Sequence, residues 1–350
     1  MRVLFLACLS PKTGNCTTAE RIRDHIIAAG HSCVLCDTRE LGSASDVTSV
    51  MTKAPGFEAA LAIHLFKGGR LLLDTGVPFG VVFGGTDVNE DVMDEHKRAA
   101  MERVMHKARH CSEISQPKPR QLYQSRLSDL LPCRVYAAVD DGIAEMSALD
   151  HSGVCGEHRW EVCSCVSTEK VEDLRVFLLV CGLRRVKDPL YLLEAFSEWH
   201  IQNPLVILII IGPKIDPVFT VEVEERVNRS AGVFLADELS KEELHAAMQK
   251  SFTLVNSSLS EGMSAAILEA MDLGLPVLAR DIPGNGAIIK HEVTGLLYTT
   301  PQEFVSISKK LLEDLELQER VVKNGKNYIK TCHNLMEERM TYQHLVESLH

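Results

Sequence analysis

The chain has 350 residues, which is enough for about two domains that each bury their own core. Its formal net charge of −11 argues against nucleic acid or an anionic membrane surface as the main partner. The longest apolar runs, residues 3–9 and 205–211, are far shorter than the about 20 residues of a membrane-spanning helix. We therefore expect a two-domain globular protein without a transmembrane segment, in which an anionic ligand needs a local cluster of positive charge.

The cysteines and the N-terminus bear on the compartment of the chain. The 11 cysteines are odd in number and scattered, and Cys33, Cys36 and Cys181 lie inside apolar strand patterns. Buried free thiols in a reducing compartment are therefore expected. The first residues, MRVLFLACLSP, weakly resemble a signal peptide, but the short apolar run fits a first buried strand better. We predict a cytoplasmic protein, with secretion as the alternative.

The first half of the chain alternates strands and helices. Apolar runs predict strands over residues 2–9, 32–36, 58–66 and 77–83, with helices over 17–29 and 89–109. Thr17 and Glu20 have the spacing of a capping box at the start of the first helix. Strands separated by helix-length segments predict a parallel, doubly wound sheet, which binds ligands at the carboxyl ends of its strands.

Three of these strand ends carry candidate functional residues. Gly14 follows the first strand, where a glycine would let the backbone approach a phosphate or an acceptor, and a plain turn glycine is an equal alternative. His64 lies near the end of the third strand, where a lone histidine is usually a satisfied core residue. The fourth strand ends in the turn FGGTDVNED. There is no G-x-G-x-x-G segment, so a nicotinamide cofactor is poorly supported.

The segment 110–168 is poorly defined by its sequence. It begins with a polar stretch that contains Pro117 and Pro119, at a place where an apolar strand would be expected. Residues 134–139 could form the last strand of the first domain. Residues 147–172 have no clean period, and we interpret them as a loop and an interdomain linker.

The second half begins with a predicted strand over 175–181, followed by GLRRVKDPLYLLEAF. Asp188 and Pro189 have the positions of an N-cap and a first helical residue. Three cations lie before that predicted helix: Arg184, Arg185 and Lys187. Such a cluster suits a diphosphate in an acidic protein, because arginine offers a planar fork and lysine a compact charge. A solvated basic turn is the alternative.

The rest of the second half continues the alternation of strands and helices. Further strands are predicted over 204–211, 232–235, 252–256 and 276–279, with helices over 218–230, 240–250, 301–315, 316–330 and 335–349. Ser240 and Glu243 have capping-box spacing. The strand over 204–211 ends in Gly212 and Pro213.

The stretch SSLSEGMSAAILEAMDLG, residues 257–274, joins a strand to a helix. Apolar residues at helical spacing, followed by Gly274 as a C-cap, predict the helix. The first amides of a helix lack intrahelical partners and favour negative charge, so the Ser-Gly turn is a candidate anion and hydroxyl site. Glu261 and Glu269 could accept hydrogen bonds from ligand hydroxyls. An ordinary amphipathic helix with a solvated glutamate is the alternative.

The E-x7-E spacing of Glu261 and Glu269, with GLPVLARDIPGNGAIIKHEVTGLLY downstream, resembles the retaining glycosyltransferases of group 1, also called family 4. The resemblance implies the α/β fold named GT-B. In this fold two Rossmann-like, doubly wound parallel-sheet domains face a central cleft. It implies an acceptor-side domain over 1–165, a nucleotide-sugar-binding domain over 166–332, and a C-terminal helix over 333–350 that packs back on the first domain.

The resemblance also implies roles for the candidate residues. Lys187 and Arg184 would stabilise the leaving diphosphate, Glu269 would hold the ribose, and Glu261 would hold the donor sugar. The other residues expected to bind the donor are Gly262, Met263, Ser264, Gly212 and Gly14. Those expected on the acceptor or sugar side are His64, Gly85, Thr86 and Asp87.

One departure from the family keeps other functions open. Gly84 stands where the family usually has the histidine of a His-Gly-Thr-Asp turn, which contacts the donor sugar. A nucleotide-sugar-binding protein without turnover is therefore the second interpretation, and an epimerase on the same fold is a third that the E-x7-E spacing disfavours. The expected substrates are a nucleotide-diphosphate sugar and an acceptor that the sequence does not identify. No metal is expected, because no Asp-x-Asp lies at a strand end, and no permanently bound cofactor is expected.

Overall fold

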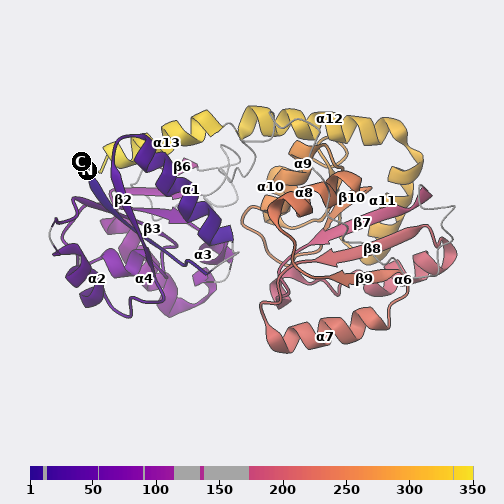
Figure 1. Ribbon diagram of the computed structural model, residues 1–350, viewed down its shortest axis with the longest axis horizontal. Coiled ribbons are helices and arrows are strands. Elements are labelled where there is room, and N and C mark those ends of the chain that lie inside the picture. Colours follow the sequence, from indigo (N-terminus) through magenta and orange to yellow (C-terminus); the bar gives the residue numbers. More distant parts are fainter. Residues whose placement is uncertain are drawn as a thin grey trace. The chain divides into compact units, whose positions relative to one another are not determined.

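The structure is a computed structural model that describes residues 1–10, 14–53, 55–89, 91–113, 135–137, 173–333 and 335–349. The chain divides into two compact units (Figure 1). Unit 1 comprises Met1–Asp140, Ser260–Ala265 and Lys330–His350, and unit 2 comprises Asp141–Leu259 and Ala266–Ile329. The predicted linker over 147–172 lies outside the described residues.

Unit 1 is built on a parallel sheet with the strand order β2-β1-β3-β4-β5-β6. The strands are β1 (Arg2–Ala7), β2 (Ser32–Asp37), β3 (Ala59–Ile63), β4 (Phe79–Phe83), β5 (His110–Glu113) and β6 (Val135–Ala137). The first four coincide closely with the predicted strands. The fifth lies in the polar segment for which the apolar pattern predicted no strand. Its backbone pairs with β4, with His110 beside Gly80, so a buried neighbouring strand supplies the pairing that its composition does not indicate.

The helices of unit 1 correct two predictions. They are α1 (Gly14–Ala28), α2 (Ala44–Met51), α3 (Gly85–Asn89), α4 (Glu95–Lys107) and α13 (Leu335–Glu347), with short 3-10 turns η1 (Gly69–Leu72) and η2 (Asp91–Met93). Because α1 already begins at Gly14, Thr17 is not its N-cap and the predicted capping box is wrong. In place of the single helix predicted over 89–109, α3 ends at Asn89 and is followed by η2 and α4. Asp94 begins α4, since its carboxylate accepts a hydrogen bond from the N–H of Lys97 at 3.0 Å.

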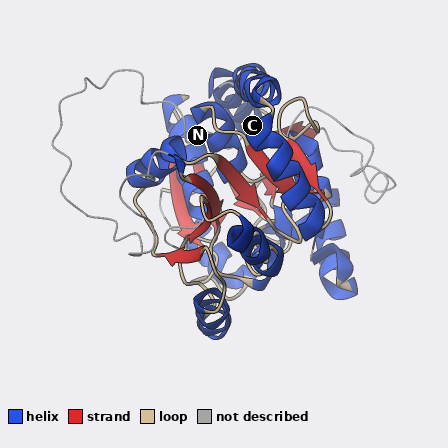
Figure 2. Ribbon diagram, turned by 90° about the vertical axis from the view of Figure 1, so that its right-hand side faces the viewer, coloured by secondary structure: helices blue, strands red, loops and turns tan. Residues whose placement is uncertain are grey.

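Successive residues of β1 pack into two different buried clusters. Val3 and Phe5 pack with α1 and α13, whereas Leu4 and Leu6 pack with α2 and α4. Helices therefore cover both faces of the sheet. This is the arrangement that near-continuous apolar strands predict. Figure 2 colours the helices of the described chain blue and its strands red.

The C-terminal helix α13 is anchored on α1 by a buried acid. The side chain of Glu338 is fully buried, and its Oε1 accepts a hydrogen bond from Nε of Arg21 at 3.0 Å. Its Oε2 lies 3.4 Å from Nε2 of His25, whose ring stacks on Tyr342. The expectation that the last helix packs on the first unit is confirmed.

Unit 2 contains a second parallel sheet, with the strand order β12-β11-β10-β7-β8-β9. Its strands are β7 (Arg175–Val180), β8 (Val206–Ile211), β9 (Val233–Ala236), β10 (Thr253–Asn256), β11 (Val277–Arg280) and β12 (Leu296–Tyr298). Its helices are α6 (Leu193–Gln202), α7 (Pro217–Asn228), α8 (Lys241–Lys250), α9 (Ala265–Leu273), α10 (Pro283–Ile288) and α11 (Pro301–Glu313), followed by α12 (Leu315–Cys332). One face is packed by a cluster of aromatic rings around Phe177, with Phe196, Trp199 and Phe304 in contact. Among the described residues, no helix is both long and apolar enough to cross a lipid bilayer.

Local signals in unit 2 were predicted with mixed success. The capping box of Ser240 and Glu243 is confirmed at the start of α8, and Gly274 ends α9 with a left-handed φ of 80°. The prediction that Asp188 caps a helix is wrong. Residues 185–187 form a 3-10 turn, η5 (Arg185–Lys187), which Asp188 ends with a left-handed φ of 44°, and α6 begins only at Leu193.

The anchor of α13 gives a prediction about stability. Substitution Glu338→Leu removes the buried carboxylate that Arg21 and His25 face, and should lower the free energy of unfolding by about 3 kcal/mol. The exposed pair of Arg23 and Asp24 on α1, the helix that carries Arg21 and His25, provides the control, because Arg23→Ala should cost less than about 1 kcal/mol. Urea unfolding followed by circular dichroism measures both. Equal losses in the two variants would contradict the anchor.

Candidate functional site

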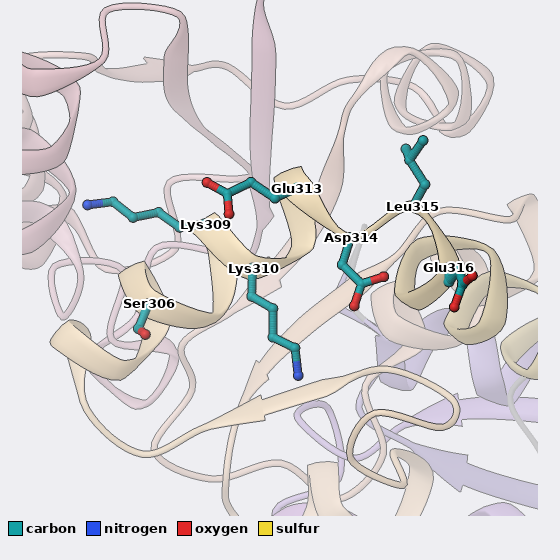
Figure 3. Close-up of a pocket in the computed structure, with 7 residues that line it drawn as sticks. All are labelled: Ser306, Lys309, Lys310, Glu313, Asp314, Leu315 and Glu316. Carbon is teal, nitrogen blue, oxygen red and sulfur yellow. The ribbon is translucent and has the colours of Figure 1, made fainter.

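Two pockets on the surface of unit 2 lie away from the carboxyl ends of its strands. One pocket lies along α11 and the start of α12 (Figure 3), and its lining residues are Ser306, Lys309, Lys310, Glu313, Asp314, Leu315 and Glu316. Another lies at the amino ends of the strands, beside Arg175, Phe252 and Pro276. Neither contains a residue that the sequence predicted to bind a ligand. The candidate site is therefore built from the carboxyl ends of the strands, where parallel sheets bind ligands.

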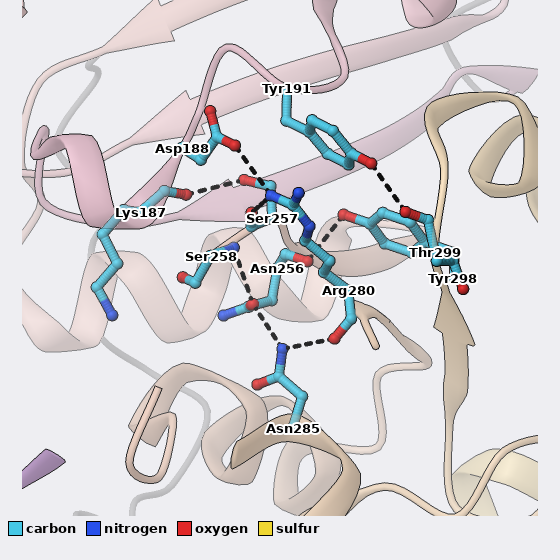
Figure 4. Close-up of polar contacts among 10 residues, drawn as sticks. All are labelled: Lys187, Asp188, Tyr191, Asn256, Ser257, Ser258, Arg280, Asn285, Tyr298 and Thr299. Carbon is cyan, nitrogen blue, oxygen red and sulfur yellow. Dashed lines mark hydrogen bonds and ion pairs between the residues drawn. The ribbon is translucent and has the colours of Figure 1, made fainter. Parts of the chain in front are cut away.

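A network of hydrogen bonds joins the turn after β7 to the loop after β10 (Figure 4). The hydroxyl of Ser257 donates to the carbonyl oxygen of Lys187 at 3.1 Å, and the N–H of Leu259 donates to the carbonyl oxygen of Val186 at 2.9 Å. These bonds fix the backbone of the turn that carries Lys187. The side chain of Lys187 extends away from the carbonyl group that Ser257 holds (Figure 4).

Arg280, the last residue of β11, closes the same network. Its Nη1 donates to Oδ2 of Asp188 at 2.9 Å and to the carbonyl oxygen of Ser257 at 3.3 Å. Its guanidinium carbon lies 3.7 Å from the centre of the Tyr191 ring, a cation–π contact. The left-handed backbone of Asp188 costs roughly 1–2 kcal/mol for a residue other than glycine. The ion pair with Arg280 holds Asp188 in this conformation, directly after Lys187.

Buried amides support the loop after β10. Oδ1 of Asn256 accepts hydrogen bonds from the N–H of Ser258 at 3.3 Å and from Nδ2 of Asn285 at 2.9 Å. The hydroxyl of Tyr298 donates to the carbonyl oxygen of Asn256 at 2.9 Å. Burial raises the pKa of the Tyr298 phenol well above its usual value, so this hydroxyl stays a donor. The loop is thus held by two amide side chains and a phenol hydroxyl, none of which changes its charge near neutral pH.

The three predicted cations have different surroundings. Arg184 and Arg185 are exposed and Lys187 is half-buried. Arg185 turns toward α7, where its Nη2 bonds Oε2 of Glu222 at 3.0 Å and its guanidinium lies 4.9 Å from the centre of the Phe219 ring. Of the three, Lys187 is the residue whose backbone carbonyl group is held by the hydrogen bond from Ser257.

Glu269 lies on α9 beside a histidine that the sequence did not indicate. Its Oε2 is 3.6 Å from Nε2 of His245 on α8, and both side chains are largely buried. His245 and Met248 form the buried face of α8, a spacing that could have been recognised in the sequence but is typical of ordinary core residues. The pairing across two helices has no local sequence signal.

The turn before α9 carries the other predicted glutamate. Glu261 and Ser264 are buried, and Gly262 and Met263 are half-buried. Residues 260–265 group with unit 1, whereas Glu269 groups with unit 2. The two glutamates of the E-x7-E spacing therefore belong to different compact units, Glu261 to unit 1 and Glu269 to unit 2.

Gly212, after β8, lies where the backbone leaves no room for a side chain. A Cβ at this position would lie 2.0 Å from the carbonyl oxygen of Cys181. The glycine is required by this close approach of two strand ends.

In unit 1, the carboxyl ends of β3 and β4 bring His64 and Asp87 together. His64 has a left-handed φ of 69° and is 2 % exposed. Its Nδ1 lies 3.3 Å from Oδ2 of the fully buried Asp87, and its Nε2 lies 3.1 Å from Nδ2 of Asn15. Asp87 also accepts hydrogen bonds from the N–H groups of Leu65 at 3.1 Å and Gly84 at 2.9 Å. Asn15 was not predicted, although the neighbouring Gly14 was.

Gly84 lies directly under the ring of His64. A Cβ built on Gly84 would lie 2.0 Å from Cε1 and 2.4 Å from Nδ1 of that ring. The imidazole from β3 thus occupies the space that a side chain at residue 84 would need. Gly85 and Thr86, the other predicted residues of this turn, are half-buried at the start of α3.

The described part of the chain contains no group of three or more His, Cys, Asp or Glu side chains placed to hold a metal ion. The positively charged side chains described at the carboxyl ends of the unit 2 strands include Arg184, Arg185, Lys187, Lys214 and Arg280.

Comparison with solved structures identifies the fold of these two parallel-sheet units. The structure of Anabaena HepE in complex with UDP-glucose matches with a TM-score of 0.76 and 16% identity, covering 99% of this chain and 100% of that one. Sucrose-phosphate synthase from Thermosynechococcus elongatus matches with a TM-score of 0.73 and 14% identity, covering 100% and 99%. The predicted GT-B fold is confirmed.

Sequence relatives define the family. The family model described as "Glycosyl transferases group 1" matches residues 166–328. Glycosyltransferase 1 domain-containing protein 1 of Xenopus tropicalis is 47% identical over 355 residues, which cover 100% of this chain and 98% of the relative. The chain belongs to the group 1 glycosyltransferases.

The contact between Gly84 and His64 gives a second prediction. Substitution Gly84→Ala places a methyl group inside the imidazole and should lower the free energy of unfolding by about 1–3 kcal/mol. Gly42→Ala, where the added Cβ meets only Oδ2 of Asp46 at 3.6 Å, should change it little. Thermal unfolding measures both variants.

A compensating change separates crowding from other causes. The double variant Gly84→Ala, His64→Gly removes the ring that the methyl group would meet. Its loss in free energy of unfolding should be smaller than the sum of the losses of His64→Gly and Gly84→Ala, because the two residues are in contact. Additive losses would contradict the overlap of the two side chains.

Proposed function

We propose that this chain transfers a sugar from a nucleotide-diphosphate sugar to an acceptor hydroxyl, with retention of configuration at the anomeric carbon. Membership of the group 1 glycosyltransferases supports this proposal, as does the fold shared with a HepE structure that contains UDP-glucose. The observation that carries it is the network that holds Lys187 at the carboxyl edge of the unit 2 sheet.

In the proposed reaction the bond between the anomeric carbon and the diphosphate oxygen breaks, and a bond to the acceptor oxygen forms. Negative charge develops on the leaving diphosphate, whose oxygen takes up the proton that the acceptor hydroxyl loses. Lys187 and Arg184 would stabilise that charge, since a pre-positioned cation costs little reorganisation during the reaction. Because these side chains supply the positive charge, the proposed transfer needs no metal ion.

Hydroxyl groups at either end of the donor fit the acidic side chains. Glu269 would accept hydrogen bonds from the ribose, and its Oε2 lies 3.6 Å from Nε2 of His245. Glu261 would accept from hydroxyls of the donor sugar, next to the amides of Gly262 and Met263.

Free thiols support a reducing compartment for this activity. Six described cysteines are not joined in disulfides: Cys8, Cys16, Cys33, Cys36, Cys181 and Cys332. Burial raises the pKa of the Cys33 thiol to about 12, so this thiol stays protonated at neutral pH. The proposal therefore places the chain in the cytoplasm.

A nucleotide-sugar-binding protein without turnover is the second candidate. The observation that favours it is Gly84, which carries no side chain where the family usually has a histidine. Hydrolysis or transfer of a bound donor distinguishes the two candidates, because both bind the donor and only the enzyme cleaves it.

A thermal-shift screen with UDP-glucose, GDP-mannose and ADP-glucose tests the donor site. A ligand at about 100 times its Kd should stabilise the wild type by about 2.7 kcal/mol. Lys187→Ala and Glu269→Ala should lose most of this shift, because they remove the proposed contacts to diphosphate and ribose.

Matched controls come from the pocket on α11. Lys309→Ala and Glu313→Ala remove the same charges at a distance from the strand ends, and they should keep the full shift. The same shift in Lys187→Ala, Glu269→Ala and both controls would contradict the proposed donor site.

A further inference from the structure

Asp87, His64 and Asn15 form a chain of contacts whose donors and acceptors are fixed by chemistry. The carboxylate of Asp87 lies 3.3 Å from Nδ1 of His64 and only accepts hydrogen bonds, so its negative charge favours a proton on Nδ1 even though this contact lacks hydrogen-bond geometry. In the neutral imidazole the other nitrogen, Nε2, is then an acceptor. It lies 3.1 Å from the amide nitrogen of Asn15, which donates to it. The buried pair therefore determines which way the Asn15 amide faces.

The chain is built at a cost in backbone conformation. His64 adopts a left-handed conformation that residues other than glycine rarely adopt, and Asp87 is fully buried with backbone N–H groups from both strand ends bonded to it. Gly84 has no side chain, which leaves room for the ring. Three separate segments of unit 1 are thus arranged around one imidazole.

The end of this chain is the side chain that ligands can reach. Asp87 is fully buried and His64 is 2 % exposed, whereas Asn15 is half-buried. Asn15 begins α1 together with Gly14, at the carboxyl end of β1, and this edge of a parallel sheet is where ligands bind. An amide can donate and accept at the same time, as a hydroxyl does.

We propose that Asn15 binds a sugar hydroxyl of a substrate, and that His64 and Asp87 are positioning residues that fix the orientation of its amide. This inference rests on the proposed glycosyl transfer and assigns a further residue to it. The hydroxyl belongs either to the donor sugar or to the acceptor. When the donor is hydrolysed, a water molecule takes the place of the acceptor hydroxyl.

The test compares UDP with UDP-glucose on the wild type, Asn15→Ala and His64→Asn, using titration calorimetry and the rate of UDP-glucose hydrolysis. Asparagine at residue 64 tolerates the left-handed backbone and lacks the ring. Both variants should bind UDP as the wild type does. They should lose about fivefold to tenfold in the preference for UDP-glucose over UDP, or in the hydrolysis rate, as expected for one lost hydrogen bond.

The two readouts distinguish the two sources of the hydroxyl. A loss in the UDP-glucose preference assigns the hydroxyl to the donor sugar, and a loss in hydrolysis rate alone assigns it to the acceptor side. The double variant should lose no more than Asn15→Ala alone, because His64 acts through Asn15. Asp24→Ala, an exposed change on the same helix, should behave as the wild type.

The inference is overturned if Asn15→Ala keeps both the preference and the rate, or if the losses of Asn15→Ala and His64→Asn add. A wild type that binds UDP-glucose while Asn15→Ala is unaltered refutes the inference and leaves the proposed function standing. A wild type that binds none of UDP-glucose, GDP-mannose and ADP-glucose refutes the proposed function as well.

Discussion

The candidate donor site depends on one constraint: the turn that carries Lys187 is held by the loop after β10 and by Arg280. Two hydrogen bonds, from Ser257 and Leu259, fix its backbone. The ion pair between Arg280 and Asp188 fixes the residue that follows Lys187. A lysine side chain has four flexible carbons, so a fixed backbone limits where its ammonium group can reach. Positive charge is thereby concentrated at one strand end of a chain whose net charge is −11.

Much of the fold follows from local sequence signals. Apolar runs identified the buried strands of both sheets, and Ser240 with Glu243 identified the start of α8, because these features depend on neighbouring residues. Strand β5 was not identified, because its pairing with β4 compensates for a polar composition. Asp188 was misassigned, because its role is to bond Arg280, which lies far along the chain, and not to cap a helix.

The candidate site was predicted in part for the same reason. Motif spacing proposed Lys187 and Glu269 as candidates, and the structure describes Lys187 at a strand end and Glu269 on a helix that follows a strand. The spacing did not identify His245, Arg280 or Asn15, whose contacts cross between elements. Gly84 and His64 illustrate the limit most clearly. In the sequence, Gly84 stands where the family usually has a histidine. In the structure, the ring of His64, which follows another strand, occupies the space that a side chain at residue 84 would need.

The central claim is that the held turn binds a diphosphate, and titration calorimetry with UDP, UMP and uridine tests it most directly. Affinity should fall at each step as phosphates are removed, and the preference for UDP over uridine should shrink in Arg280→Met, which releases Asp188 while leaving Lys187 in the sequence. Removing a charge-assisted hydrogen bond costs about 1.5–3 kcal/mol, so each step should change Kd by about tenfold or more. Uridine that binds as tightly as UDP, or an unchanged preference in Arg280→Met, would contradict the account.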